Sequence, residues 1–592
     1  MIDSQWHEQP KNDVHDKLVG TVKSLIEQGD GRQRDFARFL RLYGCADPSL
    51  IRLSYEDVPR VGGPRTAWNV IHQIVDTLVS RIGDERPRPK FQSTDGDFLT
   101  RNRAEKLTQF VDGQVEHLNL YSLGREIFRD ACIFGTGFLK LTQEEGRIIP
   151  ERVLPFFLHC DQVEALYGSP WQLFQTNSVA RNSLLKRFKN KSEIILTAPT
   201  SDSKFFTQAS LTERIDIYEA WLLPSKPGAK DGRHVICIEG ATLLDEKWER
   251  PTFPFVALRY INDPANAFWG IGVSQLLIDN QLQINKMLQS MDRAFQLAVP
   301  MVFVKKDSEV PPIVARIGNV IKYGNTKPSI ETANPISQQM VNHLLMVYDK
   351  CFELIGLSQM SATSRKEPGV TAAVAMREVA DVETMRFREI GRKWNEFYTE
   401  LAKHLVFLAK EIDEEMDGYE IPVKGEVQFE RVGFKDVDLD EDQYVLGVWA
   451  TNSLPTTPAG RLQKVEELIQ AGFIDRDAAL ELLDMPDLNR FKNLELSGRN
   501  IVMKAVDSMV NTGEYVAPEQ FMPHDFAIKY AQNAFLQGRL DGAPDEHLDQ
   551  VLKFIDGCFA FIERAEEEQL AEQPAQPPMD PNMDPGMIPG GQ

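Results

Sequence analysis

The sequence predicts a helix-rich α+β protein of several domains. Three long segments, residues 272–298, 338–357 and 371–412, repeat apolar residues at helical spacing. Residues 151–260 instead mix helical and strand patterns, with glycine- and proline-containing turns between them. The chain of 592 residues exceeds the size at which one hydrophobic core usually keeps growing, so more than one domain is expected.

Composition and charge argue against several classes of protein. Hydrophobic residues make up 42% and charged residues 26% of the chain, which is ordinary for a globular protein and unlike a disordered one. A formal net charge of −21 should repel nucleic acid unless basic groups are concentrated locally. The N-terminus has neither a basic start nor an apolar run, and no stretch of about 18 apolar residues exists, so we expect neither a signal peptide nor a membrane span.

The six cysteines form no C-x-x-C pair and have no regular spacing. We therefore expect reduced core residues in a cytosol-like compartment, and neither a disulfide framework nor a zinc site. These residues are Cys45, Cys132, Cys160, Cys237, Cys351 and Cys558.

The first part of the chain combines helices and strands. Residues 11–44, 66–83 and 101–133 have helical periodicity, and the prolines of DERPRPKF end the second of these helices. Gly135 and Gly137 in FGTGFLKL open a strand. Because no further G-x-x-G follows and no helix begins there, we interpret this G-x-G as a turn and not as a phosphate-binding loop. Strands are also predicted in RIIPERVLPFFLHCD, RIDIYEAWLL and RHVICIEG.

The helix predicted for residues 272–298 would be roughly 40 Å long, and its second face is unusual. That face is polar but nearly uncharged, and two interpretations stay open: an amide-rich surface of a core helix, or a face that packs beside copies of itself. Its residues are Asn280, Gln281, Gln283, Asn285, Gln289 and Ser290.

A small module, residues 299–337, separates this helix from the helix at 338–357. Pro300 ends the first helix, and short strand-like runs with turn residues follow. A module at the end of two long helices would stand away from the main body. Its charge balance is slightly basic because of Lys305, Lys306, Arg316, Lys322 and Lys327.

A basic loop, residues 358–370, leads to a long helix that starts at Thr371 and has Gly391 as its candidate bend. An isolated Arg-Lys pair is usually an ordinary pair of surface charges. If several copies formed a ring, however, Arg365 and Lys366 would project into the central hole and contact the phosphates of a polyanion, whatever its sequence. The loop residues are Ser364, Arg365, Lys366, Glu367, Pro368 and Gly369.

The C-terminal part is predicted to be mainly helical after the strand segment GEVQFERVGFKDVDL. Pro458 begins a helix that Gly472 ends, and Asp475 begins the next. A last helix follows Pro544. Residues 574–592 are rich in proline and glycine and are predicted to be disordered.

The sequence contains no familiar catalytic or metal-binding pattern. A phosphate loop, H-E-x-x-H, G-x-S-x-G and zinc-type cysteine spacing are all missing. DVDLDEDQYVLG resembles the start of a calcium loop, but Glu441 replaces the required glycine and Gly447 replaces the glutamate, so a solvated acidic loop is predicted. His159 and Cys160 are neighbours in a predicted strand and should point to opposite faces. We expect no catalytic residues, no metal and no cofactor.

Four segments, in this order and spacing, resemble the portal proteins of tailed bacteriophages. WNVIHQIVDTLVSRIGDERPRPKF is similar to a helix and strand entry of that family, and FGTGFLKL is similar to its next strand entry. PFVALRYINDPANAFWGIGVSQLLIDNQLQINKMLQSMDRAFQLAVPMVFV resembles the approach to the first stem helix and that helix itself. GVTAAVAMREV resembles the start of the long helix after the tunnel loop. The resemblance covers roughly residues 60–490.

The resemblance implies a portal-type subunit that assembles into a ring, usually of twelve copies, around a central channel. The implied regions are a peripheral helical region (1–59), a wing (60–260 and 371–455), stem helices (261–298 and 338–357), a clip (299–337), a tunnel loop (358–370), a helical crown (456–565) and a disordered tail (566–592).

The resemblance also implies partners and a place of action. Such a ring assembles in the host cytoplasm and occupies one vertex of the virion capsid, in contact with major capsid and scaffolding proteins. Double-stranded DNA passes through it during packaging and ejection without sequence-specific contacts, with Arg365 and Lys366 nearest the DNA. The clip docks the terminase large subunit and later the head-tail adaptor. ATP hydrolysis belongs to the terminase, so this chain is expected to be no enzyme and to contact no membrane.

Two other functions stay open at this point. One is a different head-tail structural protein of a virion, although the chain length and the helix-module-helix-loop order argue against it. The other is a hydrolase, such as a nuclease or peptidase, whose dispersed site the sequence does not reveal. The size of the particle in solution distinguishes a ring from a monomeric enzyme.

Overall fold

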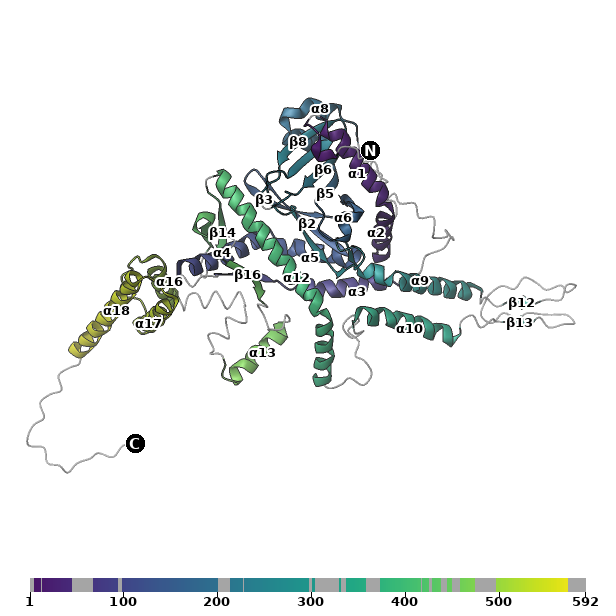
Figure 1. Ribbon diagram of the computed structural model, residues 1–592. Coiled ribbons are helices and arrows are strands. Elements are labelled where there is room, and N and C mark those ends of the chain that lie inside the picture. Colours follow the sequence, from purple (N-terminus) through teal and green to yellow (C-terminus); the bar gives the residue numbers. More distant parts are fainter. Residues whose placement is uncertain are drawn as a thin grey trace, which may run out of the picture. The chain divides into compact units, whose positions relative to one another are not determined.

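The computed structural model shows a protein of mixed helix and sheet in which helices predominate, which confirms the helix-rich α+β prediction (Figure 1). Two compact units make up the chain: unit 1 comprises Met1–Arg88 and Gln114–Asp417, and unit 2 comprises Pro89–Gly113 and Gly418–Gln592. The structure describes residues 5–11, 13–44, 68–93, 98–200, 213–226, 228–297, 301–303, 329–331, 337–357, 373–416, 418–424, 429–437, 444–449, 458–473 and 497–572.

Unit 1 contains a five-stranded antiparallel sheet in which strands that follow one another in sequence are neighbours. The last two strands are joined by a tight turn in which Gly240 has a φ of +89°, whereas helices lie in the connections on either side of the second strand. The predicted strands in RIDIYEAWLL and RHVICIEG are confirmed as the third and fourth. The strands are β4 (Leu158–His159), β5 (Gln172–Ala180), β6 (Arg214–Leu222), β7 (Arg233–Ile238) and β8 (Ala241–Lys247).

A second antiparallel sheet of unit 1 has the order β3-β2-β9, and a short pair, β10-β11, follows it in the chain. A Cβ atom on Gly137 would lie 2.2 Å from the backbone oxygen of Ile127, so only glycine fits at the start of this sheet. Gly135, at the end of the preceding helix, has a φ of +93°, which supports the interpretation of the G-x-G as a turn. The strands are β2 (Thr136–Glu144), β3 (Arg147–Val153), β9 (Phe255–Arg259), β10 (Ile261–Asn262) and β11 (Gly270–Ile271).

Helices pack against these sheets. The first helix places Val14, Leu18 and Val22 on one face, and they join Phe174 and Val235 of the five-stranded sheet in one buried cluster. The predicted helix at 66–83 is an α-helix followed by a π-helical turn, Val79–Gly83. The helices assigned wholly to unit 1 are α1 (Val14–Gln28), α2 (Asp30–Tyr43), α3 (Val70–Leu78), α5 (Leu120–Phe134), α6 (Gln162–Leu166), α7 (Arg181–Arg187), α8 (Ser192–Thr197), α9 (Val273–Leu297), α10 (Gln338–Ile355) and α12 (Ala373–Met416).

Helix α12 runs without interruption through Gly391, and its ribbon bends between its first turns and the longer remainder (Figure 1). Its buried face carries Trp394, Tyr398, Leu401 and Leu405, at the three- and four-residue intervals expected of one helix face. The indole N–H of Trp394 donates to the backbone oxygen of Glu85 at 3.2 Å. These contacts join α12 firmly to the body of unit 1.

Unit 2 contains a three-helix cluster, two strand pairs and most of α4. In the cluster, Val506, Met509, Ala531, Val551 and Phe554 are fully buried. The helix predicted after Pro544 is present, but two of its apolar residues, Leu552 and Phe559, are 42% and 46% exposed. Gly472 has a φ of +73° directly after α13, which confirms its predicted role as a helix stop. The elements are β1 (Arg88–Ser93), α4 (Phe98–His117), β14 (Glu420–Lys424), β15 (Phe429–Gly433), β16 (Tyr444–Trp449), α13 (Pro458–Gln470), α16 (Ser497–Thr512), α17 (His524–Asp541) and α18 (Asp545–Glu572).

The described cysteines agree with the prediction of reduced core thiols: Cys132, Cys160, Cys237, Cys351 and Cys558 are free and buried. Cys45, the helix start at Asp475, most of the acidic loop around Glu441, and the predicted disordered segment from residue 574 lie outside the described residues. Within the described ranges, no helix is long and apolar enough to cross a membrane, and no group of three metal-ligating side chains occurs.

Candidate functional site: the paired helices α9 and α10

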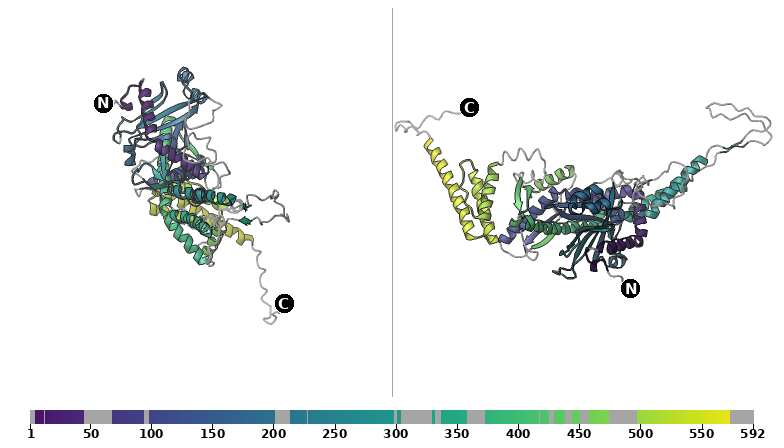
Figure 2. Two further views of the ribbon diagram at one scale, coloured as in Figure 1. Left: turned by 90° about the vertical axis from the view of Figure 1, so that its right-hand side faces the viewer. Right: turned by 90° about the horizontal axis from the view of Figure 1, so that it is seen from above.

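Helices α9 and α10 run side by side and project away from the sheets of unit 1 (Figures 1 and 2). Their bounds lie within two residues of the predicted helices at 272–298 and 338–357. Two strands of the segment between them, β12 (Met301–Phe303) and β13 (Ser329–Glu331), pair in antiparallel fashion, with Val302 opposite Ile330. The chain therefore leaves α9 and returns to α10 through a two-stranded ribbon.

Apolar side chains and amide contacts hold the two helices together. Leu277, Ile284 and Leu288 of α9 are buried. So are Leu344, Val347, Cys351 and Phe352 of α10. Between the helices, Gln283 Nε2 lies 3.4 Å from His343 Nε2. Burial raises the pKa of the Cys351 thiol to about 11, and a hydrogen bond with the Asn280 side chain partly opposes that rise. Cys351 is therefore a protonated core thiol and no nucleophile.

Gln281 fixes the base of the pair to α3. Its side-chain oxygen accepts from the backbone N–H of Val70 at 2.9 Å, and its amide nitrogen donates to the backbone oxygen of Trp68 and to Asn285 Oδ1 at 3.1 Å. The first backbone N–H groups of a helix lack partners within that helix, so this glutamine satisfies one of them at the start of α3. A second anchor comes from α10, where Tyr348 Oη donates to Gln73 Oε1 at 3.1 Å.

The structure corrects one expectation about the amide face. Gln281 is only 2% exposed, so its assignment to an outer polar face was wrong. Its side chain turns inward because it completes the hydrogen bonding at the N-terminus of α3. Asn280, Gln283 and Asn285 also have partners inside the chain, on α10 or on Gln281 itself, and Gln289 is half-buried. Much of the amide row thus serves the fold of a single subunit.

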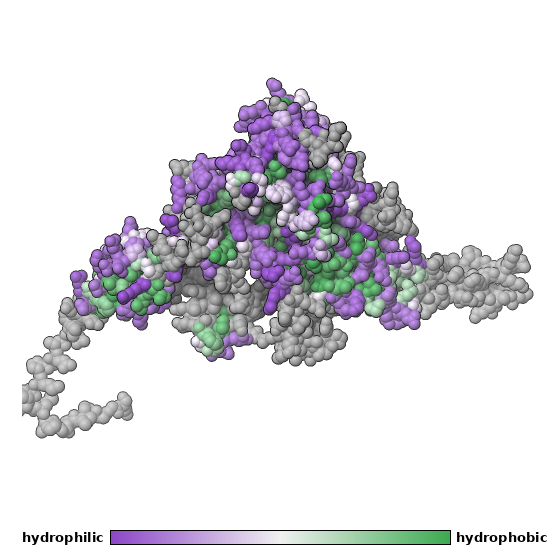
Figure 3. All heavy atoms as spheres, viewed as in Figure 1, coloured by the Kyte–Doolittle hydropathy of each residue, from purple (hydrophilic) through white to green (hydrophobic). Residues whose placement is uncertain are grey.

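Several apolar side chains of α9 and α10 are exposed. Leu276 and Phe295 of α9 are 44% and 60% exposed. Leu345, Met346 and Leu354 of α10 are 46%, 52% and 62% exposed. Figure 3 shows hydrophobic residues gathered over α10 on the face in view. Groups of exposed apolar side chains commonly mark surfaces that pack against another chain.

The predicted DNA-facing and docking residues lie outside the described residues. This holds for the whole tunnel loop, with Ser364, Arg365, Lys366, Glu367, Pro368 and Gly369, and for the basic residues of the clip, Lys305, Lys306, Arg316, Lys322 and Lys327. The charges of α9 balance, with Asp279 and Asp292 against Lys286 and Arg293, and α10 has Asp349 and Glu353 against Lys350. The described part of the pair therefore has no excess of cations.

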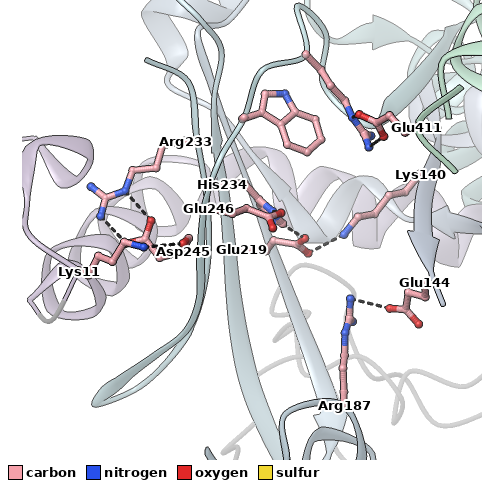
Figure 4. Close-up of polar contacts among 12 residues, drawn as sticks. Lys11, Lys140, Glu144, Arg187, Glu219, Arg233, His234, Asp245, Glu246 and Glu411 are labelled. Carbon is pink, nitrogen blue, oxygen red and sulfur yellow. Dashed lines mark hydrogen bonds and ion pairs between the residues drawn. The ribbon is translucent and has the colours of Figure 1, made fainter. Parts of the chain in front are cut away.

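A buried polar network joins the two sheets of unit 1 (Figure 4). Lys140 of β2 contacts Glu219 Oε2 of β6 at 2.6 Å and Gln175 Oε1 of β5 at 2.8 Å. His234 of β7 bridges Glu219 Oε1 at 2.9 Å and Glu246 Oε1 at 2.7 Å. Because Lys140 comes from one sheet and its partners from the other, the network connects the sheets as an internal ionic bridge.

The charges of this network stabilise one another. Burial by itself would raise the pKa of Glu219, but Lys140 and the hydrogen bond with His234 lower it to about 2. Burial by itself would lower the pKa of His234, but its hydrogen bonds with Glu219 and Glu246 raise it. Lys140 also lies 4.8 Å from the ring centre of Trp221. Since Lys140, Glu219 and His234 find their polar partners within the network, these side chains stabilise the junction between the two sheets.

His159 and Cys160 are both buried. The His159 ring contacts Thr176 Oγ1 at 3.1 Å, and burial followed by the nearby charge of Arg32 lowers its pKa to about 3. Burial raises the pKa of the Cys160 thiol to about 12. Neither group has the protonation behaviour of an acid-base catalyst or an activated nucleophile near neutral pH.

No protein-family model matches the sequence, and no curated protein is similar enough to serve as a relative.

Proposed function

We propose that this chain is the subunit of a bacteriophage portal: a ring at one capsid vertex through which DNA is packaged, retained and ejected. One observation carries the proposal. Two long helices, joined at their far ends through a two-stranded ribbon, project from a body of sheets and helices, and a third long helix, α12, follows them in the chain. This is the order in which the stem helices, clip and wing helix of the resembling family occur.

The anchoring of the pair supports this proposal mechanically. Hydrogen bonds from Gln281 and Tyr348 tie α9 and α10 to α3, whose five apolar residues are buried in unit 1. A pair held in this way at its base acts as a strut, because movement of either helix breaks buried hydrogen bonds. Struts arranged around an axis keep a channel open.

The exposed apolar residues support association of copies. A single subunit leaves Met346 and Leu354 of α10 in water, whereas a neighbouring copy in a ring would cover such residues. In this arrangement, α9 and α10 form the stem and β12 with β13 belongs to the clip. The clip docks the terminase large subunit and later the head-tail adaptor. The surrounding body forms the wing, and the C-terminal helices form the crown.

The chemistry of the channel is electrostatic in this proposal and includes no catalysis by the chain. Arg365 and Lys366 in the tunnel loop contact phosphates of double-stranded DNA, in a manner independent of base sequence and weakened by salt. The net charge of −21 keeps the remaining surface from holding DNA, which suits passage better than storage. The major capsid and scaffolding proteins surround the ring in the virion.

Particle mass tests the proposal. Native mass spectrometry of the purified full chain should detect a closed assembly of roughly 800 kDa, about twelve times the subunit mass of 67.2 kDa. Met346→Glu, on α10, should reduce the assembled fraction strongly because a carboxylate would be buried at the subunit contact. Met416→Glu at the end of α12, where the methionine is 59% exposed, is the matched control and should assemble normally. A monomer under all conditions, or equal assembly of both variants, would contradict the proposed subunit contact.

A further inference from the structure

A groove opens at one end of the five-stranded sheet, where β5 begins and β6 and β8 end. Its volume is about 320 Å³. Three segments that are far apart in the sequence line it: Pro170 and Trp171 precede β5, Pro224 and Lys226 follow β6, and Pro251 follows β8. Three prolines and a tryptophan thus come together from separate parts of the chain.

Hydrogen bonds fix the walls of this groove. The backbone N–H of Trp171 donates to Glu164 Oε2 at 2.8 Å, and its backbone oxygen accepts from the N–H of Leu223 at 2.9 Å. In the opposite wall, the N–H of Ser225 donates to Asp231 Oδ1 at 3.0 Å. The groove is therefore formed before any ligand arrives, which reduces the entropy lost on binding.

Trp171 gives the groove its binding chemistry. Its side chain is 53% exposed, and no acceptor among the described residues contacts its indole N–H. A polyproline II helix has no internal hydrogen bonds, so its carbonyl groups are free to accept from such a donor. Proline rings of the ligand pack against aromatic and proline side chains of a groove in the recurring mode of proline-rich recognition.

The chain itself contains a ligand of this kind. Pro574 and Pro577, and again Pro578 and Pro581, have the spacing P-x-x-P. Since polyproline II has three residues per turn, each pair presents its two rings on the same face. The segment can therefore place two proline rings at once against a groove lined by Trp171 and prolines.

Charge at the rim of the groove favours the same segment. Lys226 is exposed, and no carboxylate among the described residues pairs with it, whereas Glu249 is neutralised by Lys230 at 3.3 Å. The segment carries two carboxylates, Asp580 and Asp584. An unpaired ammonium group beside the groove attracts a peptide of this charge.

We propose that the groove around Trp171 binds residues 574–592 of this chain as a polyproline II helix, with the Trp171 indole N–H donating to a backbone carbonyl of the segment and Lys226 contacting its carboxylates. This interaction is separate from channel formation. It involves the five-stranded sheet and the C-terminal segment, and it involves neither α9 nor α10. It gives the C-terminal segment a binding site on the body of a subunit.

A labelled peptide tests this interaction directly. The protein used is the full-length chain with Pro574, Pro577, Pro578 and Pro581 replaced by alanine, so that its own segment no longer competes. A fluorescein-labelled peptide of residues 573–592 should then bind saturably in fluorescence anisotropy. Adding Trp171→Ala should weaken binding at least about tenfold, as expected for a central aromatic contact. Phe521→Ala, which removes a residue that is 92% exposed in unit 2, should leave it unchanged.

Two further binding measurements distinguish a damaged groove from a misfolded protein. Lys226→Glu, a surface change, should weaken binding and reduce its dependence on salt. A peptide with all four P-x-x-P prolines changed to alanine should not bind to the chain with an intact groove. Equal binding of Trp171→Ala, equal binding of the alanine peptide, or the absence of saturable binding to the starting protein would overturn the proposal.

Discussion

Replacing Lys140 with methionine should lower the stability of unit 1 at the junction between the three-stranded and five-stranded sheets. The substitution keeps most of the side-chain volume but removes the cation that contacts Glu219 at 2.6 Å and Gln175 at 2.8 Å. The side chains of Lys140 and Glu219 are only 6% and 16% exposed. Removing one partner of a buried ion pair typically costs about 3–5 kcal/mol, because the other charge stays buried without compensation.

The pKa of Glu219 gives a second measure of the effect. Its lowering from 4.5 to about 2, achieved against burial by Lys140 and His234, corresponds to about 3 kcal/mol of stability at neutral pH. His234 still contacts Glu219 in the variant and preserves part of this contribution. We therefore expect Lys140→Met to lower the local free energy of unfolding by about 2–4 kcal/mol, which makes amide exchange on the order of 100-fold faster.

Hydrogen exchange of peptides from β6 and β7, followed by mass spectrometry at pH 7, measures this change where it occurs. Lys23→Met is the matched control, since Lys23 forms an exposed pair with Glu239 at 2.6 Å and such surface pairs contribute less than about 1 kcal/mol. If both variants exchange at the rate of the natural chain in β6 and β7, the buried network does not stabilise the sheet junction and the reasoning is refuted.

The network also predicts how this stability varies with pH. The pKa of Glu219 is lowered in the folded state, so its contribution is present above pH 4.5 and is lost as the pH falls toward about 2. The pKa of His234 is raised, so its contribution is present below pH 6.5 and is lost as the pH rises through the folded-state pKa. After correction for intrinsic exchange rates, protection of β6 and β7 should be greatest between about pH 4.5 and 6.5.

Three other changes have distinct expected outcomes. Gln281→Leu should cost about 2 kcal/mol, because the buried N–H of Val70 and the partly buried backbone oxygen of Trp68 lose this partner, and exchange of α3 amides should accelerate; unchanged protection would contradict the anchoring role. Gly137→Ala should destabilise unit 1, since the added Cβ would meet the backbone oxygen of Ile127. Gly391→Ala should instead stabilise α12 by about 0.5–1 kcal/mol, because no atom lies within 4 Å of the added Cβ. Thermal melts that rank the stabilities of the two variants in the opposite order would refute this pair of expectations. Replacing Arg365 and Lys366 by alanine should leave assembly intact but lower DNA packaging or retention, and unchanged yield and length of packaged DNA would reject their channel role.

The long helices could be predicted from sequence because their signal is local. The apolar repeat of α9 extends over seven turns, and Pro300 marks its end, so the predicted and observed bounds nearly coincide. The glycine stop at Gly472 depends only on a local backbone conformation and was also predictable. The strands β6 and β7 were also predicted from their local sequence, whereas β5 and β8 were not.

Contacts between distant parts of the chain were not predictable in this way. Gln281 has the spacing of a surface amide, and nothing near it in the sequence shows that its partners, Trp68 and Val70, are more than 200 residues away. Lys140 likewise stands among the apolar residues of FGTGFLKL, which was the one available signal, but its partners Glu219 and Gln175 come from another sheet. Such polar contacts depend on tertiary structure, which periodicity does not encode.

Electron micrographs of the purified full-length chain test the central claim most directly, because they show whether copies surround a common axis. We predict class averages of closed rings with a central opening, from which the region containing α9 and α10 protrudes on one side. Class averages that show only isolated single subunits with no opening would contradict a channel built from these paired helices.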